Sequence, residues 1–265
     1  MEMITNIHPH TRLTDRVVAP RSDLTQISRN SLPESIDSSE GFVPVWSDIH
    51  KLSEEHLDRN RIVAFRANHR VTRAFDMLRN QLAHQHADIS KPIVAVTAPS
   101  PGCGTSVTAI NLAFSFARLS TRPVLLVDAN LTAPASERLL GLAPLPSRSR
   151  GAPGNQHIVV DASGAQINLL RPYAARSAPG TLASDEIAAD IIRVRQALMP
   201  SVVILDLAAL LHCDTAVQLL ALADSTVLVV ASNQTTRSEF EVSQTFFSQD
   251  KKVQVVLNKA RRHGL

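Results

Sequence analysis

The 265-residue sequence has few of the residues on which several large classes of protein depend. Aromatic residues make up only 4% of the chain, which argues against a surface that stacks the bases of single-stranded nucleic acid. The two cysteines, Cys103 and Cys213, are too few for a disulfide framework and fit a reducing compartment. No apolar run is long enough to cross a membrane, and the first residues lack a signal-peptide core. These absences predict a cytoplasmic protein whose partner is not nucleic acid.

What the sequence does contain is a series of short runs of Val, Ile and Leu. Runs that are apolar at every position are typical of strands covered on both faces, as in a parallel sheet between helices. The expected fold class is therefore α/β, a three-layer P-loop NTPase-like fold with a mostly parallel central sheet flanked by helices. We expect strands over 93–97, 123–128, 167–170, 201–206, 224–232 and 252–259, and helices over 61–87, 107–117 and 185–198.

A glycine-containing loop follows the first of the main strands and precedes an apolar helix. Such a loop binds phosphate by directing backbone N–H groups and a helix N-terminus at the phosphate oxygens. The usual pattern places a lysine before the Ser that contacts Mg²⁺, and here that position is Thr105. The sequence thus predicts the backbone of a nucleotide site without its main positive charge. The candidate cofactor-binding residues in this loop are Gly102, Cys103, Gly104, Thr105, Ser106 and Val107.

Two aspartates end two of the predicted strands. Asp128 follows the run 124–127, and Asp206 follows the run 202–205. Ligands of open α/β sheets bind at the carboxyl ends of the strands, so both carboxylates are expected close to the loop. Asp128 and Asp206 are the candidate remnant catalytic residues. With the Ser106 hydroxyl they are also the candidate ligands of Mg²⁺, if the ion binds.

Five collinear segments carry a family resemblance. Residues 97–113 read TAPSPGCGTSVTAINLA, 124–134 read VLLVDANLTAP, and 203–209 read VILDLAA. Residues 73–82 read RAFDMLRNQL, and 255–258 read VVLN. The chain resembles, over roughly residues 65–260, the kinase domain of the bacterial tyrosine autokinases (BY-kinases) of capsule and exopolysaccharide synthesis, within the MinD/ParA group of P-loop ATPases.

The resemblance implies ATP or ADP with Mg²⁺ as the ligand and Asn258 as a contact of the adenine. It also implies subunit contacts through the helix around 73–82. A charge inversion there, with Arg73 and Asp76 where the family has Glu and Arg, leaves open a retained interface or a solvated surface pair.

The departures from the family pattern all remove charge or a conserved turn from the site. Thr105 replaces the phosphate lysine, Asn130 a second carboxylate, and residues 132–133 two arginines. Residues 207–209 replace a Thr-Pro-Pro. Phosphoryl transfer depends on positioning and charge neutralisation, so we expect nucleotide binding to be weak or absent and catalysis lost. The family phosphorylates a tyrosine-rich tail, whereas the sole tyrosine here is Tyr173, so autophosphorylation of such a tail is excluded.

Two parts of the chain differ in composition. Residues 1–60 are polar with scattered apolar side chains and are predicted to be a flexible N-terminal extension, and 61–265 the P-loop NTPase-like domain. The apolar patch 42–46 in the extension docks on a partner or folds back on the domain, two alternatives that the sequence leaves open. Residues 143–156 are predicted to be a mobile loop.

Three functions are consistent with these observations. The favoured one is a pseudokinase-like, non-catalytic relative of the autokinases that regulates or scaffolds polysaccharide polymerisation and export. Its expected partner is a membrane-anchored polysaccharide co-polymerase or an active kinase paralogue, which would hold it at the inner membrane as a peripheral protein. The alternatives are an active ATPase or tyrosine kinase with a rearranged site, and a ParA/MinD-type positioning ATPase. The absence of an early second lysine in the loop counts against the last.

Overall fold

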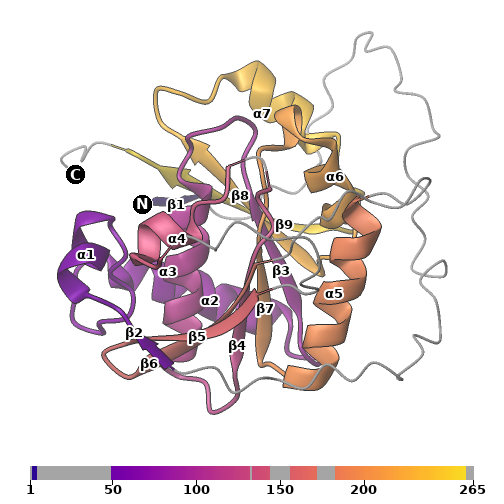
Figure 1. Cartoon of the computed structure of the whole chain (residues 1–265). Helices are drawn as coiled ribbons and strands as arrows, with labels where there is room; N and C mark the ends of the chain where they lie inside the picture. Colours follow the sequence, from indigo (N-terminus) through magenta and orange to yellow (C-terminus); the bar gives the residue numbers. More distant parts are fainter. Residues whose placement is uncertain (1, 5–48, 132, 144–155, 172–182, 261–265) are drawn as a thin grey trace, which may run out of the picture.

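The structure is a computed structural model, and it describes residues 2–4, 49–131, 133–143, 156–171 and 183–260. These residues form a central sheet flanked by helices (Figure 1). The strands are β1 (Glu2–Ile4), β2 (Ile49–Lys51), β3 (Ile93–Thr97), β4 (Val124–Asp128), β5 (Gln156–Ala162), β6 (Ala165–Arg171), β7 (Val202–Asp206), β8 (Ser225–Ala231) and β9 (Lys252–Asn258). The helices are α1 (Glu54–Arg59), α2 (Thr72–Gln85), α3 (Thr105–Ala117), α4 (Ser136–Leu140), α5 (Ala183–Leu198), α6 (Asp214–Leu220), α7 (Arg237–Gln244) and the 3-10 turn η3 (Leu210–His212).

The sheet has the order β1-β9-β8-β3-β7-β4-β6-β5-β2. Its six central strands, from β9 to β6, run parallel, while β1 pairs antiparallel with β9 and β5 pairs antiparallel with β6. Because the central strands are parallel, their carboxyl ends meet at one edge of the sheet. The expected mostly parallel α/β sheet is confirmed, and β3, β7 and β4 lie in its middle.

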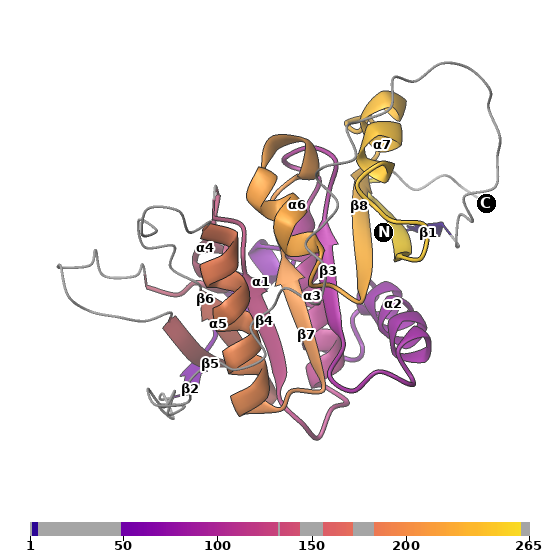
Figure 2. The same ribbon diagram turned by 90° about the vertical axis from the view of Figure 1, so that its right-hand side faces the viewer.

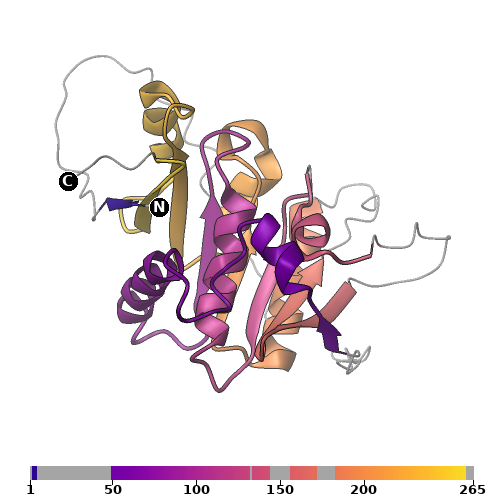
Figure 3. The same cartoon turned by 90° about the vertical axis from the view of Figure 1, so that its left-hand side faces the viewer.

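The two faces of the sheet bury two separate cores. Alternate residues of β3 point to opposite faces, so Val94 and Val96 join one core while Ile93 and Ala95 join the other. The first core lies under α2 and α3, and the second under α5 and α6 (Figures 2 and 3). Strands buried in this way on both faces account for the continuous apolar runs of the sequence.

Helix α2 uses its apolar side chains for this core. Phe75, Leu78 and Leu82 are 4%, 0% and 0% exposed, so they are covered by the rest of the chain. The resemblance assigned this helix to subunit contacts, but its apolar stripe is not free to make them. Arg73 is exposed and Asp76 accepts hydrogen bonds from Arg79 and Arg118 instead of pairing with Arg73.

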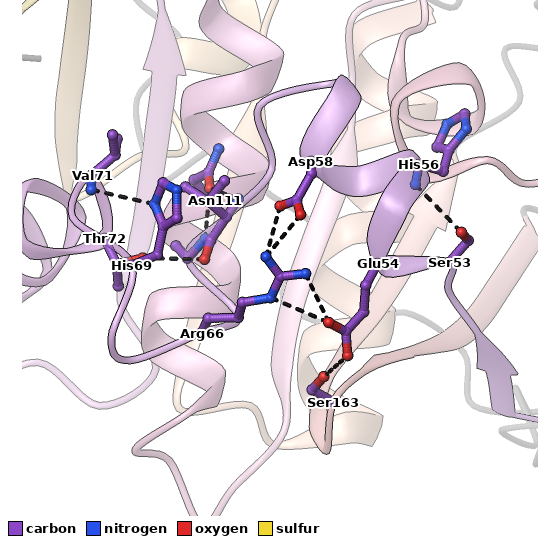
Figure 4. Close-up of polar contacts among 12 residues, drawn as sticks. Ser53, Glu54, His56, Asp58, Arg66, His69, Val71, Thr72, Asn111 and Ser163 are labelled. Carbon is purple, nitrogen blue, oxygen red and sulfur yellow. Dashed lines mark hydrogen bonds and ion pairs between the residues drawn. The ribbon is translucent and has the colours of Figure 1, made fainter.

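A buried asparagine of α3 joins this helix to the chain that precedes α2. Asn111 Oδ1 accepts the backbone N–H groups of Val63 and Ala64 at 2.8 and 2.9 Å. Its Nδ2 donates to the carbonyls of Arg61 and Val107 at 2.9 and 2.8 Å. All four hydrogen bonds of the amide are therefore made inside the protein, and they fix residues 61–64 along α3 (Figure 4).

Helix α1 is attached to the same segment. The Arg66 guanidinium pairs with Glu54 at 2.7 Å and with Asp58 at 2.8 Å, both on α1 (Figure 4). Leu57 of α1 is 0% exposed and belongs to the first core. Residues 49–60, expected in the N-terminal extension, thus form β2 and α1 as part of the folded domain, because Leu57 supplies apolar surface that the core covers. The apolar patch 42–46 lies outside the described residues.

The sequence-based expectations for the remaining elements had mixed outcomes. The strand expected over 167–170 is the middle of β6, and the helix over 185–198 is α5. The helix expected over 61–87 begins only at Thr72, because residues 61–64 bond to Asn111 in place of helical partners. Most of the predicted mobile loop at 143–156, and Tyr173, lie outside the described residues.

Candidate nucleotide-binding site

The glycine loop lies at the carboxyl end of β3, at the same end of the sheet as α6 and α7 (Figure 1). Gly102 and Gly104 have φ angles of 81° and 94°, which glycine adopts at low cost and other residues rarely do. Gly104 precedes the first turn of α3, and Thr108 donates both its N–H and its hydroxyl to the Gly104 carbonyl, at 3.0 and 2.9 Å. The two glycines therefore build the sharp entry to α3 that the sequence predicts.

Thr105 and Ser106 begin α3, where a phosphate-binding loop presents its lysine and serine. Both residues are half-buried, as are Gly104 and Val107, while Cys103 is 0% exposed. The Ser106 hydroxyl hydrogen-bonds the carboxyl group of Asp206. The structure thus brings Ser106 and Asp206 together as the sequence predicted, and the residue at position 105 contributes a hydroxyl in place of an ammonium.

Asp128 and Asp206 lie opposite each other on the paired strands β4 and β7. They are 4% and 2% exposed. Burial raises the pKa of Asp206 well above its usual range, the nearby charge of Asp128 raises it further, and the Ser106 bond opposes both. Burial also raises the pKa of Asp128, against the effect of its hydrogen bonds to Ser136. Both carboxyl groups therefore favour the protonated form more than an exposed aspartate does.

The donor set is compatible with Mg²⁺. One oxygen of each aspartate, Oδ1, is buried without a hydrogen-bond partner among the described residues. Mg²⁺ is held in proteins by one or two carboxylates together with water and phosphate oxygens. Asp128, Asp206 and the Ser106 hydroxyl fit such a site. Among the described residues, no group of three or more His, Cys, Asp or Glu is placed to hold a metal ion. A Mg²⁺ ion at this site would therefore need water or phosphate oxygens as further ligands.

Asn258, expected to contact adenine, lies at the end of β9 directly beside the loop. Its Nδ2 donates to the carbonyl of Cys103 at 2.9 Å, and its Oδ1 accepts the N–H of Lys259 at 2.8 Å. The neighbouring turn after β8 also reaches the loop, where Gln234 Nε2 donates to the carbonyl of Pro101 at 2.7 Å. Asn258 is thus placed at the loop as expected, but both ends of its amide are engaged within the protein.

Sequence reasoning missed the residues that contact the loop from the 234–239 segment. Ser100 Oγ donates to Glu239 Oε1 at 2.6 Å, and this bond is the main cause of the lowered pKa of Glu239. A signal for this segment exists, because Thr236 and Glu239 form a capping box that begins α7. No local pattern indicates that the segment packs on the loop, since this contact joins residues more than 130 positions apart.

A groove lies away from the glycine loop. It has a volume of about 650 Å³ and runs between β2, α1 and the end of α4. Its ionisable lining residues are His50, Lys51, His56 and Arg59. None of its lining residues belongs to the glycine loop, so it is a separate feature of the surface.

Comparisons with known proteins bear on the fold. No protein-family model matches the sequence, and no curated protein matches it. Among solved structures, the VpsO kinase domain is 19% identical with a TM-score of 0.56, covering 79% of this chain and 100% of its own. The kinase domain of the Escherichia coli tyrosine kinase ETK is 19% identical with a TM-score of 0.52, covering 73% of this chain and 78% of its own. The chain has the fold of these tyrosine kinase domains.

A further solved structure extends this similarity over more of the chain. The chimerical protein CapA2B2 is 19% identical with a TM-score of 0.60, covering 85% of this chain and 98% of its own. The resemblance read from the sequence motifs is confirmed at the level of the fold. No described helix is long and apolar enough to cross a membrane.

Proposed function

We propose that this chain is a non-catalytic relative of the capsule and exopolysaccharide tyrosine autokinases, and that it regulates or scaffolds polysaccharide polymerisation and export. The observation that carries the proposal is Thr105 at the first position of α3, beside a loop whose backbone is intact. The chain has kept the scaffold of a nucleotide site and replaced the cation that the triphosphate requires.

Charge explains why this replacement matters. A triphosphate brings several negative charges to a site that already holds two buried carboxyl groups, Asp128 and Asp206. A charge-assisted contact is worth about 1.5–3 kcal/mol, so loss of the lysine alone lowers affinity by roughly ten- to a hundredfold. Loss of a group that stabilises the charge developing in the transition state raises the activation free energy by about 3–4 kcal/mol. A loop without lysine therefore supports contacts better than it supports phosphoryl transfer.

The partner in this proposal is a membrane-anchored polysaccharide co-polymerase or an active kinase paralogue, which would place the chain at the inner membrane as a peripheral protein. Because the apolar stripe of α2 is covered by the core, a partner would contact the outer face of this helix. Met77 on this face is 53% exposed, and Arg73, Asn80 and His84 are exposed at helical spacing around it. A homo- or hetero-oligomer through the Arg73–Leu82 region would use this polar face, with Met77 as its apolar centre.

The test begins with calorimetric titration of ATP and ADP, with and without Mg²⁺. We expect weak or undetectable binding, and a submicromolar affinity for Mg-ATP would contradict the proposal. Incubation with ATP followed by mass spectrometry is expected to show no phosphotyrosine.

The cellular test compares the pocket with the surface. A deletion strain is complemented with an Asp206→Ala chain or with a chain altered on the outer face of α2, Met77→Asp. We expect polymer production to survive the pocket change and to fall with the surface change. Both chains are first shown to reach normal levels in the cell. Loss of polymer only with Asp206→Ala would mean that the pocket carries the function.

One observation favours a second candidate, an active ATPase or tyrosine kinase with a rearranged site. Ser106, Asp128 and Asp206 still meet at the end of the sheet, in a donor set compatible with Mg²⁺. Under this alternative, Mg²⁺-dependent release of phosphate from ATP would be measurable and would disappear in Asp206→Asn.

A further inference from the structure

The glycine loop is held from one side by two turns that lie far from it in the sequence. Gln234, after β8, donates to the Pro101 carbonyl at 2.7 Å, and Asn258, at the end of β9, donates to the Cys103 carbonyl at 2.9 Å. Lys259 Nζ donates to Gln234 Oε1 at 2.9 Å and so connects the two turns. We call Gln234, Asn258 and Lys259 the loop brace.

The brace fits against the two glycines of the loop. A Cβ on Gly104 would collide with Asn258 Nδ2, and a Cβ on Gly102 would lie 3.1 Å from Gln234 Nε2. Each glycine therefore leaves room for one side-chain amide of the brace. The need for glycine at position 104 comes from this contact as well as from its positive φ.

The backbone of both turns is in the left-handed region, which asparagine adopts more readily than other non-glycine residues and which is costly for lysine. Asn233, directly before Gln234, has a φ of 59°, and Lys259, directly after Asn258, has a φ of 57°. For a non-glycine residue this left-handed region costs on the order of 1 kcal/mol or more and persists where the surrounding contacts compensate. The two residues with positive φ are thus the direct neighbours of Gln234 and Asn258, whose side chains contact the loop.

The planarity of the peptide bond gives these contacts a directional effect. In a trans peptide the carbonyl and the following N–H point in opposite directions. A donor that holds the Pro101 carbonyl on one side therefore directs the Gly102 N–H to the other side. The Asn258 contact with Cys103 has the same effect on the Gly104 N–H.

We propose that Gln234 and Asn258 are positioning residues that fix the orientation of two loop peptides, 101–102 and 103–104, when no nucleotide is bound. Both peptides precede a glycine, where the chain has the most freedom to flip, and each is held by one side-chain amide. The brace does the ordering that bound phosphate would otherwise supply. This inference does not depend on whether nucleotide binds or on the proposed regulatory function.

Cys103 provides a probe for loop opening, because its side chain is 0% exposed within the loop. In a Cys213→Ser background, the rate at which a thiol reagent labels Cys103 in the absence of nucleotide measures how often the loop opens. We expect labelling about tenfold faster in Asn258→Ala, since one hydrogen bond to a buried carbonyl is lost. Lys252→Ala, at the other end of β9, is the matched control and is expected to label at the unchanged rate.

Two further variants separate the hydrogen bond from packing. Asn258→Asp keeps the size of the side chain but cannot donate, so it is expected to label as fast as Asn258→Ala. Labelling of either Asn258 variant at the unchanged rate, or acceleration explained entirely by loss of global stability in urea unfolding, would overturn the proposal.

Gly104→Ala tests the same contact from the other side. Alone it should destabilise the chain through both its positive φ and its collision with Asn258. Combined with Asn258→Ala, the collision is removed, so the loss should be smaller than the sum of the two single losses. Additive losses would contradict the close contact. If Gly104→Ala does not fold, the labelling series decides the question by itself.

Discussion

Asp128 and Asp206 lie opposite each other on the neighbouring strands β4 and β7. The glycine loop, residues 98–106, contains no Lys or Arg. Replacing Asp206 by Asn removes one of two buried carboxyl groups and keeps an oxygen that accepts the Ser106 hydroxyl. We expect Asp206→Asn to raise the free energy of unfolding, because burial next to Asp128 disfavours the charged form of the Asp206 carboxyl group in the folded chain and a neutral amide does not have this cost. Urea unfolding with a chelator present measures the change. Asp88→Asn, at an exposed position, is the control and should stay within about 0.5 kcal/mol.

Thr105→Lys is expected to strengthen Mg-ATP binding by roughly ten- to a hundredfold, because it restores a charge-assisted contact with the phosphates. Thr105→Met, which has a similar length and no charge, is the matched control and should show no gain. Calorimetry measures both. Equal behaviour of the two variants would show that the loop does not present the side chain at position 105 to a phosphate.

Asn111→Ala is expected to lower the free energy of unfolding by about 2–4 kcal/mol, because it leaves the buried backbone N–H groups of Val63 and Ala64 without partners. The exposed Asn68→Ala is the control. Proteolysis should cut residues 61–71 faster in Asn111→Ala than in the control. A loss no larger than that of the control would mean that water satisfies these groups.

Two histidines, the buried His86 and the half-buried His157, predict a loss of stability in mild acid. Burial lowers the pKa of His86 and of His157, so the unfolded chain binds protons that the folded chain does not. Stability should therefore be constant above the unfolded pKa of 6.5 and fall below it, by at most about 1.4 kcal/mol per pH unit for each histidine. Urea unfolding between pH 7.5 and 5.5 measures this slope.

Replacing both histidines by Gln should flatten the slope in this pH range, and the exposed His84→Gln should not. Most carboxyl groups titrate at lower pH, but the pKa of Asp206 is raised by burial, and its protonation stabilises the folded chain as the pH falls, which opposes the effect of the histidines. The series is therefore measured in an Asp206→Asn background. A slope that is the same in the double variant would assign the acid sensitivity to other groups.

The sequence predicted the parts of the fold that depend on local patterns. Continuous apolar runs gave β3, β4, β7, β8 and β9, and the aspartates at the ends of β4 and β7 were placed together because parallel strands end at one edge. A hairpin was missed although its signal is present. Ser163 and Gly164 form the two-residue turn between β5 and β6, with φ angles of 52° and 85°, as in the tight turns that favour glycine.

Features that depend on distant segments could not be predicted in this way. The three-residue strands β1 and β2 are too short for a periodic signal. The side chains of Gln234 and Asn258 reach the loop only because β8 pairs with β3, and β9 with β8, in the sheet. The same reason applies to Leu57, which looks like part of a polar segment and is buried by packing alone.

The pairing of β1 with β9 has a consequence for the order in which the chain can fold. Residues Glu2–Ile4 pair with Val255–Leu257, so this edge joins two segments that lie more than 250 positions apart in the sequence. Pairings between residues so far apart in sequence form slowly, since the chain must close a very long loop before the contact forms. The strand that β1 pairs with is synthesised only after β3, β4 and β7, so the centre of the sheet can form before this edge does. Folding on the ribosome would therefore begin at the β3–β4–β7 centre and end at this edge.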